Sequence, residues 1–295
     1  MVVWNNGTFQ EEAGKIDSLN FSLHYANPVV WEGIRSYLQE DGTTKIWKLK
    51  EHIERLFDSA KIIGVEIPHV ISDVISACEQ VVEKNGGGDL YLRPVVYSKN
   101  DAESVMPQPT NIALDIYCFP IPQLHKTKEI KMGISNITRG YPQFQMQAKT
   151  AANYSVIQLA KSQMEIMKVD DMFFTDNQGY IVEATVANFF VIKGNVVMTP
   201  PNRGSILPGI TRRTIAELLM NSALMFVKHK KAPLVIEKDI TKADLYTADC
   251  VILCGTYAEV VNVLEIDGRK IGSPETHEYF HLIRDEYQKL VRGKG

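Results

Sequence analysis

The segment 119–126 (FPIPQLHK) constrains the possible folds of this chain more than any other stretch. It contains two prolines and interrupts both the helical and the strand-like spacing of apolar residues. A chain of 295 residues is long enough for two domains, and domain boundaries fall in connections of this kind. We therefore predict a small first domain at residues 1–119, a connection at 120–129 and a larger second domain at 130–295.

The first half reads as helices packed on a mostly antiparallel sheet, an α+β layer. Two helices are predicted, one from Leu49 to a C-terminal Gly64 and one over residues 71–84. A tight turn is predicted at Asn5-Asn6-Gly7. The predicted strands cover residues 2–4, 21–25, 29–35, 89–97 and 111–119.

The second half predicts a strand, a helix after Lys149, a series of short strands and two later helices. One of these later helices follows Thr211, and the last begins at the Ser273-Pro274 cap. A hairpin turn is predicted at Asp267-Gly268. The predicted strands cover 130–137, 172–174, 180–183, 188–192, 196–199 and 251–254.

Composition excludes several classes of function. The formal net charge of −3 offers no electrostatic attraction for nucleic acid or for an anionic membrane. No apolar run is long enough to span a membrane, and the N-terminus lacks an export signal, so we expect a cytoplasmic protein. The four cysteines are scattered without zinc-site spacing, and we expect buried, reduced thiols and no metal.

Lys149 is the strongest catalytic candidate. It lies in the segment 147–154 (QAKTAANY), where small neighbours leave room for a planar ligand and Tyr154 follows. The apolar residues of the predicted helix that follows share one face: Val156, Ile157, Ala160, Met164 and Met167. Lysine forms Schiff bases when desolvation lowers its pKa. The alternative is a solvated loop lysine.

Three further features are candidate anion sites. The segment 207–211 (LPGIT) precedes a helix whose N-terminal N–H groups can bind a phosphate, although it can equally be an ordinary helix cap. Thr256 follows a glycine at a strand end, which is a common phosphate contact and a common turn. Arg55 lies on the polar side of its helix, where it either holds a phosphate or is solvated.

Glu183 lies at the end of a predicted strand and is followed by mostly small residues. A glutamate in such a place is usually exposed on the surface. The alternative use is to hold a proton on a ring nitrogen, which is the task of the acidic partner of a pyridine cofactor.

Together these segments resemble the fold-type IV pyridoxal-phosphate aminotransferases, most closely the branched-chain amino acid aminotransferases. The resemblance covers nearly the whole chain, and the order and spacing of its motifs are specific although each motif alone is weak. It implies a small α/β N-terminal domain and a larger domain built on a pseudo-barrel. The motifs that carry it are His24-Tyr25, Trp31-Glu-Gly-Ile-Arg35, Glu51-His-Ile-Glu-Arg-Leu56, Tyr91-Leu-Arg-Pro94, Ala148-Lys149, Asn153-Tyr154, Glu183 with Asn188-Phe189, Leu207-Pro-Gly-Ile-Thr-Arg212 and Gly255-Thr-Tyr-Ala-Glu259.

The resemblance implies a role for each candidate. Lys149 would bind the cofactor covalently and carry the proton between the substrate α-carbon and the cofactor's C4′. Glu183 would keep the pyridine nitrogen protonated, and Tyr154 would hydrogen-bond the ring's phenolic oxygen. The phosphate would be held by Arg55, Ile210, Thr211 and Thr256, and Leu207 would also contact the cofactor. The substrate pocket would be lined by Tyr25, Trp31, Tyr91, Arg93, Thr256 and Tyr257.

The implied reaction exchanges amino groups between L-branched-chain amino acids and 2-oxoglutarate, as in branched-chain amino acid biosynthesis, in a homodimer or larger homo-oligomer. The alternatives are a D-amino acid or (R)-amine transaminase of the same fold, an aminodeoxychorismate-type lyase and a non-catalytic cofactor-binding protein. Arg93 would bind the second carboxylate of glutamate, the alternative being an interstrand salt bridge. The glycine-free loop 98–106 and the aliphatic Ile121 and Leu124 depart from the family pattern beside the pocket.

Overall fold

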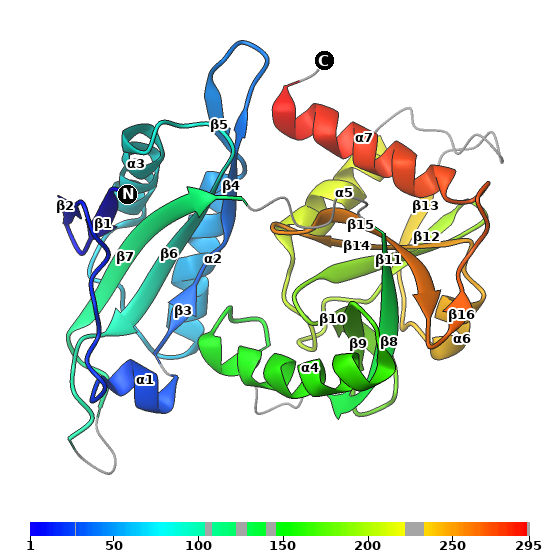
Figure 1. The fold of residues 1–295 in the computed structure, drawn as a ribbon, viewed down its shortest axis with the longest axis horizontal. Helices are drawn as coiled ribbons and strands as arrows, with labels where there is room; N and C mark the ends of the chain where they lie inside the picture. Colours follow the sequence, from blue (N-terminus) through cyan, green and yellow to red (C-terminus); the bar gives the residue numbers. More distant parts are fainter. Residues whose placement is uncertain (27, 104–107, 122–128, 140–145, 222–232, 294–295) are drawn as a thin grey trace. The chain divides into compact units, whose positions relative to one another are not determined.

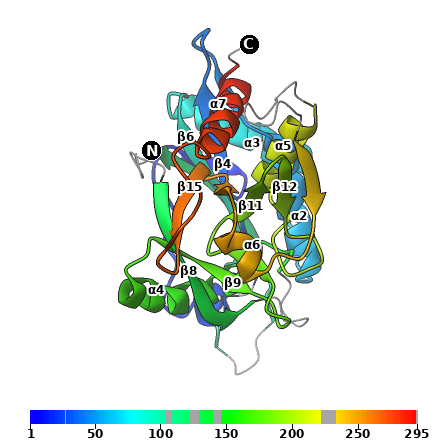
Figure 2. The ribbon, with the colours of Figure 1, turned by 90° about the vertical axis from the view of Figure 1, so that its right-hand side faces the viewer.

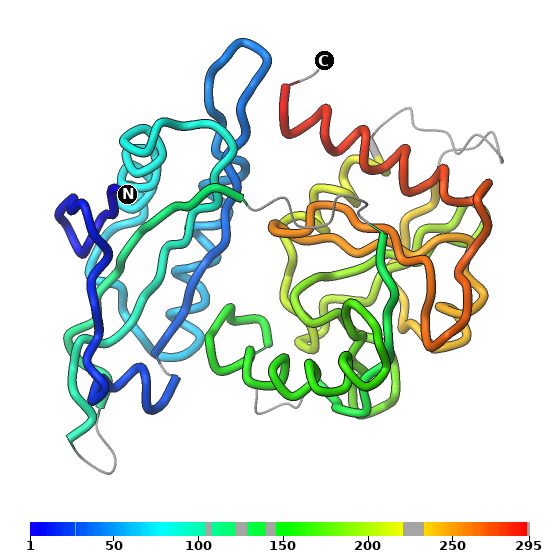
Figure 3. Tube along the Cα trace, in the orientation of Figure 1, coloured from blue at the N-terminus to red at the C-terminus, as the bar shows by residue number. Residues whose placement is uncertain are grey.

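The computed structural model describes the chain except residues 27, 104–107, 122–128, 140–145, 222–232 and 294–295. The chain forms two compact units. The first comprises Met1–Pro122, Ala148–Ser155 and Val291–Lys294, and the second comprises most of the rest. The path of the chain can be followed in Figure 3. The segment that carries Lys149 thus belongs to the first unit. Most of the predicted connection at 120–129, including Leu124, and part of the loop 98–106 lie outside the described residues, so the predicted domain boundaries stay a prediction.

The first unit is an antiparallel sheet in the order β2-β1-β7-β6-β4-β5, with β3 also paired to β6. Its strands are β1 (Val3–Asn5), β2 (Thr8–Gln10), β3 (Val30–Trp31), β4 (Ile34–Leu38), β5 (Thr44–Ile46), β6 (Leu90–Ser98) and β7 (Ile112–Pro120). Helices α2 (Leu49–Ile62) and α3 (Ile71–Lys84) pack on the sheet, as Figure 1 shows. Both predicted helices are confirmed, and so is the α+β layer.

The predicted strand at residues 21–25 is wrong, because these residues form the short helix α1 (Phe21–Tyr25). The side chain of Asn20 accepts a hydrogen bond from the backbone N–H of Ser22 and so caps the first turn. Phe21 and Ser22 are buried while Leu23 and Tyr25 are exposed. The alternation of apolar and polar residues over 21–25 (FSLHY) favours a strand, but a local side-chain cap selects a helix here.

Strand β6 divides its side chains between two faces of the sheet. Leu92 and Val96 belong to the core that the sheet forms with α2 and α3. Tyr91 and Arg93 alternate with them and therefore point to the opposite face. This alternation places an aromatic ring and a cation side by side on the face that is not covered by α2 and α3.

The second unit is a nine-stranded mixed sheet in the order β10-β9-β8-β15-β14-β11-β12-β13, with β16 paired to β15. The two end strands approach one another, because Ile181 of β10 forms a bridge with Ile240, which follows β13. Figure 2 shows the curvature of this sheet, and the expected pseudo-barrel is confirmed. Its strands are β8 (Glu129–Thr138), β9 (Asp171–Thr175), β10 (Ile181–Ala184), β11 (Asn188–Lys193), β12 (Val196–Thr199), β13 (Leu234–Glu237), β14 (Cys250–Gly255), β15 (Glu259–Ile266) and β16 (Arg269–Lys270).

The remaining helices are the 3-10 helix η1 (Ala151–Tyr154), α4 (Ser155–Met167), α5 (Ile210–Asn221), α6 (Lys242–Tyr246) and α7 (Glu278–Arg292). The helix predicted after Lys149 is confirmed, although Met167 is exposed rather than packed. The predicted last helix begins later than expected, because Thr276 caps a turn at Ser273 before α7 starts. Among the described residues, every helix is too short or too polar to span a bilayer.

Candidate functional site

The backbone around Lys149 is fixed to two elements of the first unit. The N–H of Trp31 donates to the Lys149 carbonyl at 3.2 Å, and the N–H of Ala151 donates to the Val29 carbonyl at 2.8 Å. The Lys149 N–H donates to Ser59 Oγ on α2 at 3.0 Å. Hydrogen bonds on both sides therefore hold the lysine in a fixed place beside β3 and α2.

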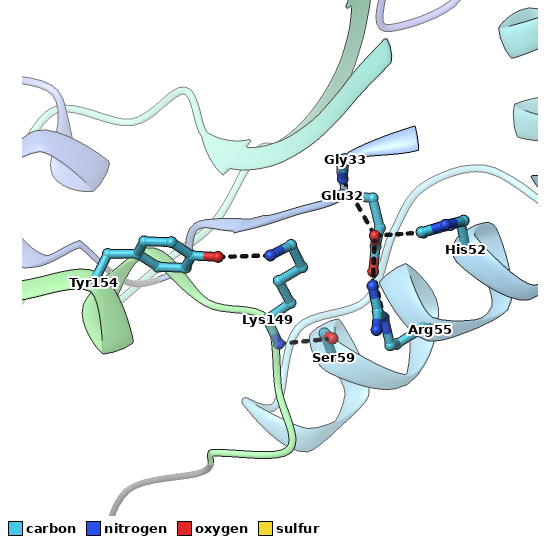
Figure 4. A network of polar contacts seen from close by, with 7 residues as sticks. All are labelled: Glu32, Gly33, His52, Arg55, Ser59, Lys149 and Tyr154. Atoms are coloured by element: carbon cyan, nitrogen blue, oxygen red, sulfur yellow. Dashed lines mark hydrogen bonds and ion pairs between the residues drawn. The ribbon is translucent and has the colours of Figure 1, made fainter. Parts of the chain in front are cut away.

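The amine of Lys149 lies among aromatic groups. Its Nζ donates to Tyr154 Oη at 2.6 Å and lies 4.0 Å from the centroid of the Trp31 ring. The rings of Trp31 and Tyr154 are 5.0 Å apart. Figure 4 shows the lysine extended toward the tyrosine hydroxyl. This half-buried, hydrogen-bonded amine does not fit a solvated loop lysine, and the structure joins Lys149 to Tyr154, the two candidates of the segment 147–154.

Arg93 lies within a wall of aromatic rings on the same sheet. Its guanidinium carbon is 4.4 Å from the centroid of Trp31, 5.5 Å from Tyr91 and 5.9 Å from Phe119. Among the described residues it pairs with no carboxylate, and its Nε is buried without a hydrogen-bond partner. The alternative of an interstrand salt bridge is therefore not observed within the described chain.

Gly33 shapes this wall through its lack of a side chain. A methyl group at this position would overlap with the hydroxyl of Tyr91. Strand β4, which begins one residue later, pairs with β6 so that Arg35 lies opposite Tyr91. Glycine is therefore required at position 33 for the tyrosine to occupy its place.

Arg55 forms a buried ion pair that sequence reasoning missed. Its Nε donates to Glu32 Oε1 at 2.6 Å and a terminal nitrogen donates to Oε2 at 2.9 Å, while Nδ1 of His52 lies 2.8 Å from Oε2 (Figure 4). Arg55 is only 12% exposed, so the solvated-arginine alternative is wrong. A glutamate in a segment whose neighbours are mostly apolar was the available signal, since buried acids need partners.

The charge states of this cluster follow from its burial and its contacts. Burial by itself raises the pKa of the Glu32 carboxyl, but the charge of Arg55 and the hydrogen bond to His52 outweigh it and hold the pKa well below its usual range. Burial lowers the pKa of His52, so its imidazole is neutral and donates Nδ1–H to the carboxylate. Glu32 is thus an anion that orients the guanidinium of Arg55 on α2.

Glu183, on β10 of the second unit, is buried with only 4% exposure, so the surface alternative is wrong. Its Oε2 accepts hydrogen bonds from Asn188 Nδ2 at 3.3 Å and from the Leu207 N–H at 3.2 Å. Its Oε1 lies 3.3 Å from a terminal nitrogen of Arg139. Sequence reasoning missed Arg139, for which no local pattern gave a signal.

The start of α5 is held close to Glu183. Asn188 Nδ2 also donates to the Leu207 carbonyl at 3.2 Å, which ties the segment before the helix to β11. A methyl group at Gly209 would overlap with Asn188 Oδ1. Ile210 and Thr211 are buried in the first turn of α5.

The other predicted site residues lie on turns and on α1. Thr256 and Tyr257 lie in the turn between β14 and β15, and β14 pairs with β11 so that Cys254 is opposite Asn188. Tyr25 lies on α1, where its ring packs 4.8 Å from that of Phe21. All four cysteines are buried and free, and among the described residues no group of acidic, histidine or cysteine side chains could hold a metal.

Each unit carries donor groups of a kind that a pyridine cofactor with an aldehyde and a phosphate requires. A lysine amine lies 2.6 Å from a tyrosine hydroxyl in the first unit. The second unit supplies a buried carboxylate hydrogen-bonded to the segment that opens α5, a helix whose first N–H groups can bind an anion.

Comparison with known proteins relates the chain to the aminotransferases. Residues 30–266 match the family model of the class IV amino-transferases. A putative branched-chain-amino-acid aminotransferase of Methanocaldococcus jannaschii is 33% identical over 293 residues, which cover 98% of this chain and 96% of that protein.

Two crystal structures resemble the chain over its full length. The branched-chain aminotransferase from Thermoproteus uzoniensis with norvaline has a TM-score of 0.88 and 31% identity, covering 100% of this chain and 95% of that one. The branched-chain amino acid aminotransferase from Thermobaculum terrenum in its PLP form (the holo form) has a TM-score of 0.87 and 28% identity, with coverage of 100% and 94%.

Proposed function

Because the chain belongs to the class IV aminotransferases, we propose that it transfers amino groups from L-branched-chain amino acids to 2-oxoglutarate with pyridoxal 5′-phosphate (PLP) as cofactor. The resemblance expected from the sequence motifs is confirmed, together with its fold class. The names of the similar proteins support the amino donors, and the PLP form in which one of them was crystallised supports the cofactor.

When bound, pyridoxal phosphate supplies an aldehyde that links to amines and a protonated ring that accepts the electron pair of the α-carbon. Lys149 would bind it covalently through Nζ and then carry a proton to and from the substrate α-carbon. Tyr154 Oη, 2.6 Å from that amine, would orient Nζ and hydrogen-bond the ring's phenolic oxygen. Glu183 would hold the proton on the ring nitrogen as a charged acceptor.

The phosphate would be held by charge and by helix N–H groups. Arg55 would contribute its guanidinium, which Glu32 fixes in orientation through two hydrogen bonds. Thr256 would add a hydroxyl from the turn after β14. The remaining phosphate contacts would come from Ile210 and Thr211 at the start of α5. Leu207 would contribute to the cofactor site through its N–H, which is bonded to Glu183.

The observation that carries the substrate proposal is the environment of Arg93. The pocket must accept an aliphatic chain in one half-reaction and a charged side chain in the other. Trp31 and Tyr91 supply apolar contact area, and Arg93 adds a cation that no carboxylate of the described chain balances. A buried carboxylate requires such a partner. Arg93 can therefore bind the side-chain carboxylate of glutamate, and the rings of Trp31 and Tyr91 can contact the side chain of leucine. Tyr25, Thr256 and Tyr257 would complete the lining.

A half-reaction panel tests this function. The purified holoenzyme is mixed separately with L-leucine, L-glutamate, D-alanine and (R)-1-phenylethylamine, and loss of the cofactor's visible absorbance is followed. We expect L-leucine and L-glutamate to bleach it and the other two to leave it unchanged. Lys149→Ala serves as the control, since it should respond to none of the four and form no borohydride-reducible link to the cofactor.

Other outcomes of the panel identify the alternatives. Bleaching by D-alanine or by the (R)-amine alone would indicate a D-amino acid or (R)-amine transaminase of this fold. A cofactor that no amino acid bleaches would favour a lyase or a non-catalytic binding protein. We further propose that the protein is cytoplasmic, serves branched-chain amino acid biosynthesis and acts as a homodimer or larger homo-oligomer, since the family resemblance implies a pocket completed by a neighbouring subunit.

A further inference from the structure

Arg139 is a buried charge to which the proposed function assigns no task. It directly follows β8, and its backbone N–H donates to the Thr175 carbonyl of β9 at 2.7 Å. Its side chain is only 8% exposed within the second unit. An arginine is almost never buried to this degree unless its charge is paired, so its partners indicate its purpose.

The partners of Arg139 lie on β9 and β10 or directly after β10. One terminal nitrogen donates to the Thr185 carbonyl at 3.4 Å, and the other lies 3.3 Å from Glu183 Oε1. The guanidinium carbon lies 5.4 Å from the centroid of the Phe174 ring. A carbonyl, a carboxylate and an aromatic face thus fix the guanidinium beside the acid that would meet the cofactor.

We propose that Arg139 is a positioning residue, whose charge keeps Glu183 ionised and turned so that this glutamate can hold the proton on the cofactor's ring nitrogen. The inference rests on the proposed role of Glu183. The two oxygens of the Glu183 carboxylate have different neighbours. Oε1 faces Arg139, and Oε2 is bonded to Asn188 and to the Leu207 N–H.

The physical need for Arg139 follows from the burial of Glu183. A carboxyl taken out of water favours its neutral form and can titrate near neutral pH, whereas an opposite charge within about 4–6 Å restores the ionised form. A neutral carboxylic acid cannot stabilise a ring-nitrogen proton by charge. The amide of Asn188 and the N–H of Leu207 favour the carboxylate through hydrogen bonds, but neither carries a charge.

Two other charged or titratable groups on neighbouring elements have partners of their own. Asp171 on β9 accepts a hydrogen bond from Thr185 Oγ1 at 2.6 Å, and burial raises the pKa of this carboxyl. Arg212 on α5 pairs with Glu237 at 2.7 Å. Among the described residues, the ion pair observed for Glu183 is the one with Arg139.

The test measures binding of pyridoxamine 5′-phosphate to the full-length apoprotein, because this probe needs no covalent link to Lys149. Dissociation constants are determined from about pH 8.5 to about pH 6 for the unsubstituted protein and for each variant. The variants are Arg139→Met, Arg139→Lys, Glu183→Gln and the double variant with Arg139→Met and Glu183→Gln. Dividing by the unsubstituted value at each pH cancels the probe's own titration.

For Arg139→Met we expect the ratio of its dissociation constant to that of the unsubstituted protein to rise as pH falls. The rise should approach about tenfold per pH unit where Glu183 becomes protonated in the variant. Arg139→Lys, which retains the charge, should keep a nearly constant ratio. In the double variant the pH dependence should vanish, because the carboxyl of Glu183 is replaced by an amide that does not titrate. Arg203→Met, which removes an exposed arginine paired with Asp239 in the same unit, is the control and should bind normally at every pH.

A loss of affinity that is the same at every pH, or that persists with its pH dependence in the double variant, would overturn the proposal and leave Arg139 a purely structural residue. Unchanged affinity in Glu183→Gln at every pH would instead refute the proposed role of Glu183. If Arg139→Met does not fold, the unsubstituted protein decides. It must bind pyridoxamine 5′-phosphate more tightly than Glu183→Gln does down to about pH 5. Loss of this difference in affinity between about pH 8 and pH 6 would overturn the proposal.

Discussion

At the residue scale, Arg93 offers the clearest test of substrate choice. Its guanidinium stacks on Trp31 and Tyr91, and no carboxylate of the described chain pairs with it. Arg93→Leu should therefore slow the half-reaction with L-glutamate far more than that with L-leucine. A carboxylate left unpaired should cost roughly 2–5 kcal/mol of transition-state binding.

Single-turnover rates with the two donors measure this difference. Arg292→Leu is a matched control, because it removes an arginine of the same unit that pairs with Asp89. It should leave the ratio of the two rates unchanged. Equal losses for both donors in Arg93→Leu would remove Arg93 from side-chain recognition and strengthen the case for a D-amino acid or amine substrate.

The buried ion pair of Glu32 and Arg55 predicts a pH-dependent contribution to stability. Replacing one member of such a pair leaves the other charge uncompensated, so Glu32→Gln should lower the free energy of unfolding by about 3–5 kcal/mol at neutral pH. The folded-state pKa of Glu32 lies well below the range of a glutamate in the unfolded chain. The stabilisation is thus fully present above the unfolded-state pKa and is lost as pH falls through the folded-state pKa.

Urea denaturation across the acid range checks this prediction. The difference between the unsubstituted protein and Glu32→Gln should stay constant from neutral pH down to about pH 5 and shrink only below the unfolded-state pKa. Asp89→Asn, which removes an acid from a more exposed pair with Arg292, is the control and should change stability by about 1 kcal/mol or less. A difference that already disappears between about pH 7 and pH 5 would show that Glu32 is not held ionised by Arg55.

At the scale of elements, the contact between β11 and the start of α5 depends on Gly209. A methyl group there would overlap with Asn188 Oδ1, and Asn188 links Glu183 to the Leu207 carbonyl. Gly209→Ala should therefore displace the first turn of α5 and weaken cofactor binding at least tenfold, which corresponds to about 1.4 kcal/mol.

Fluorescence titration of the apoprotein with pyridoxamine 5′-phosphate measures that loss. Gly255→Ala is the steric control, since a methyl group at this position meets its nearest atom at 3.4 Å, an ordinary contact. Normal cofactor affinity in Gly209→Ala would indicate that the segment before α5 can shift without disturbing the phosphate site. Asn188 would then have no part in placing the helix.

At the scale of the whole molecule, the surface of the first unit predicts self-association. Ile16, Leu19, Leu23 and Tyr25 are large apolar residues that are exposed in this chain. Ile16 and Leu23 also line a mostly apolar cavity of about 420 Å³. An exposed apolar hollow such as the one that Ile16 and Leu23 line is typical of an interaction site, and a second copy of the chain is the partner that the family resemblance implies.

Sedimentation should therefore give a species of at least twice the 33.2 kDa chain mass. Leu23→Glu should shift the protein toward the single-chain mass and reduce activity on dilution, because a charge cannot be buried in the interface without a partner. Ile166→Glu, at an exposed apolar position on α4, should remain associated and active. A fully active single chain would contradict the proposed homodimer.

Local patterns in the sequence determined the regular elements and the chemistry of single residues. Helix α3 begins and ends where its apolar spacing predicted, because helical periodicity is a property of neighbouring residues. Lys149 and Tyr154 could be grouped from the sequence because they lie five residues apart in one small-residue segment, and the structure joins them by a hydrogen bond. The order of the motifs was sufficient to indicate the family.

Tertiary structure alone decided which charges are buried together. Glu32 and Arg55 are 23 residues apart, and Arg139 meets Glu183 only because β8, β9 and β10 are neighbours in one sheet. No periodicity encodes such pairs, because each charge is tolerated inside the protein only when a distant element supplies its partner. Residues 21–25 have a different cause, because the cap from the neighbouring Asn20 and the burial of Phe21 selected a helix over the expected strand.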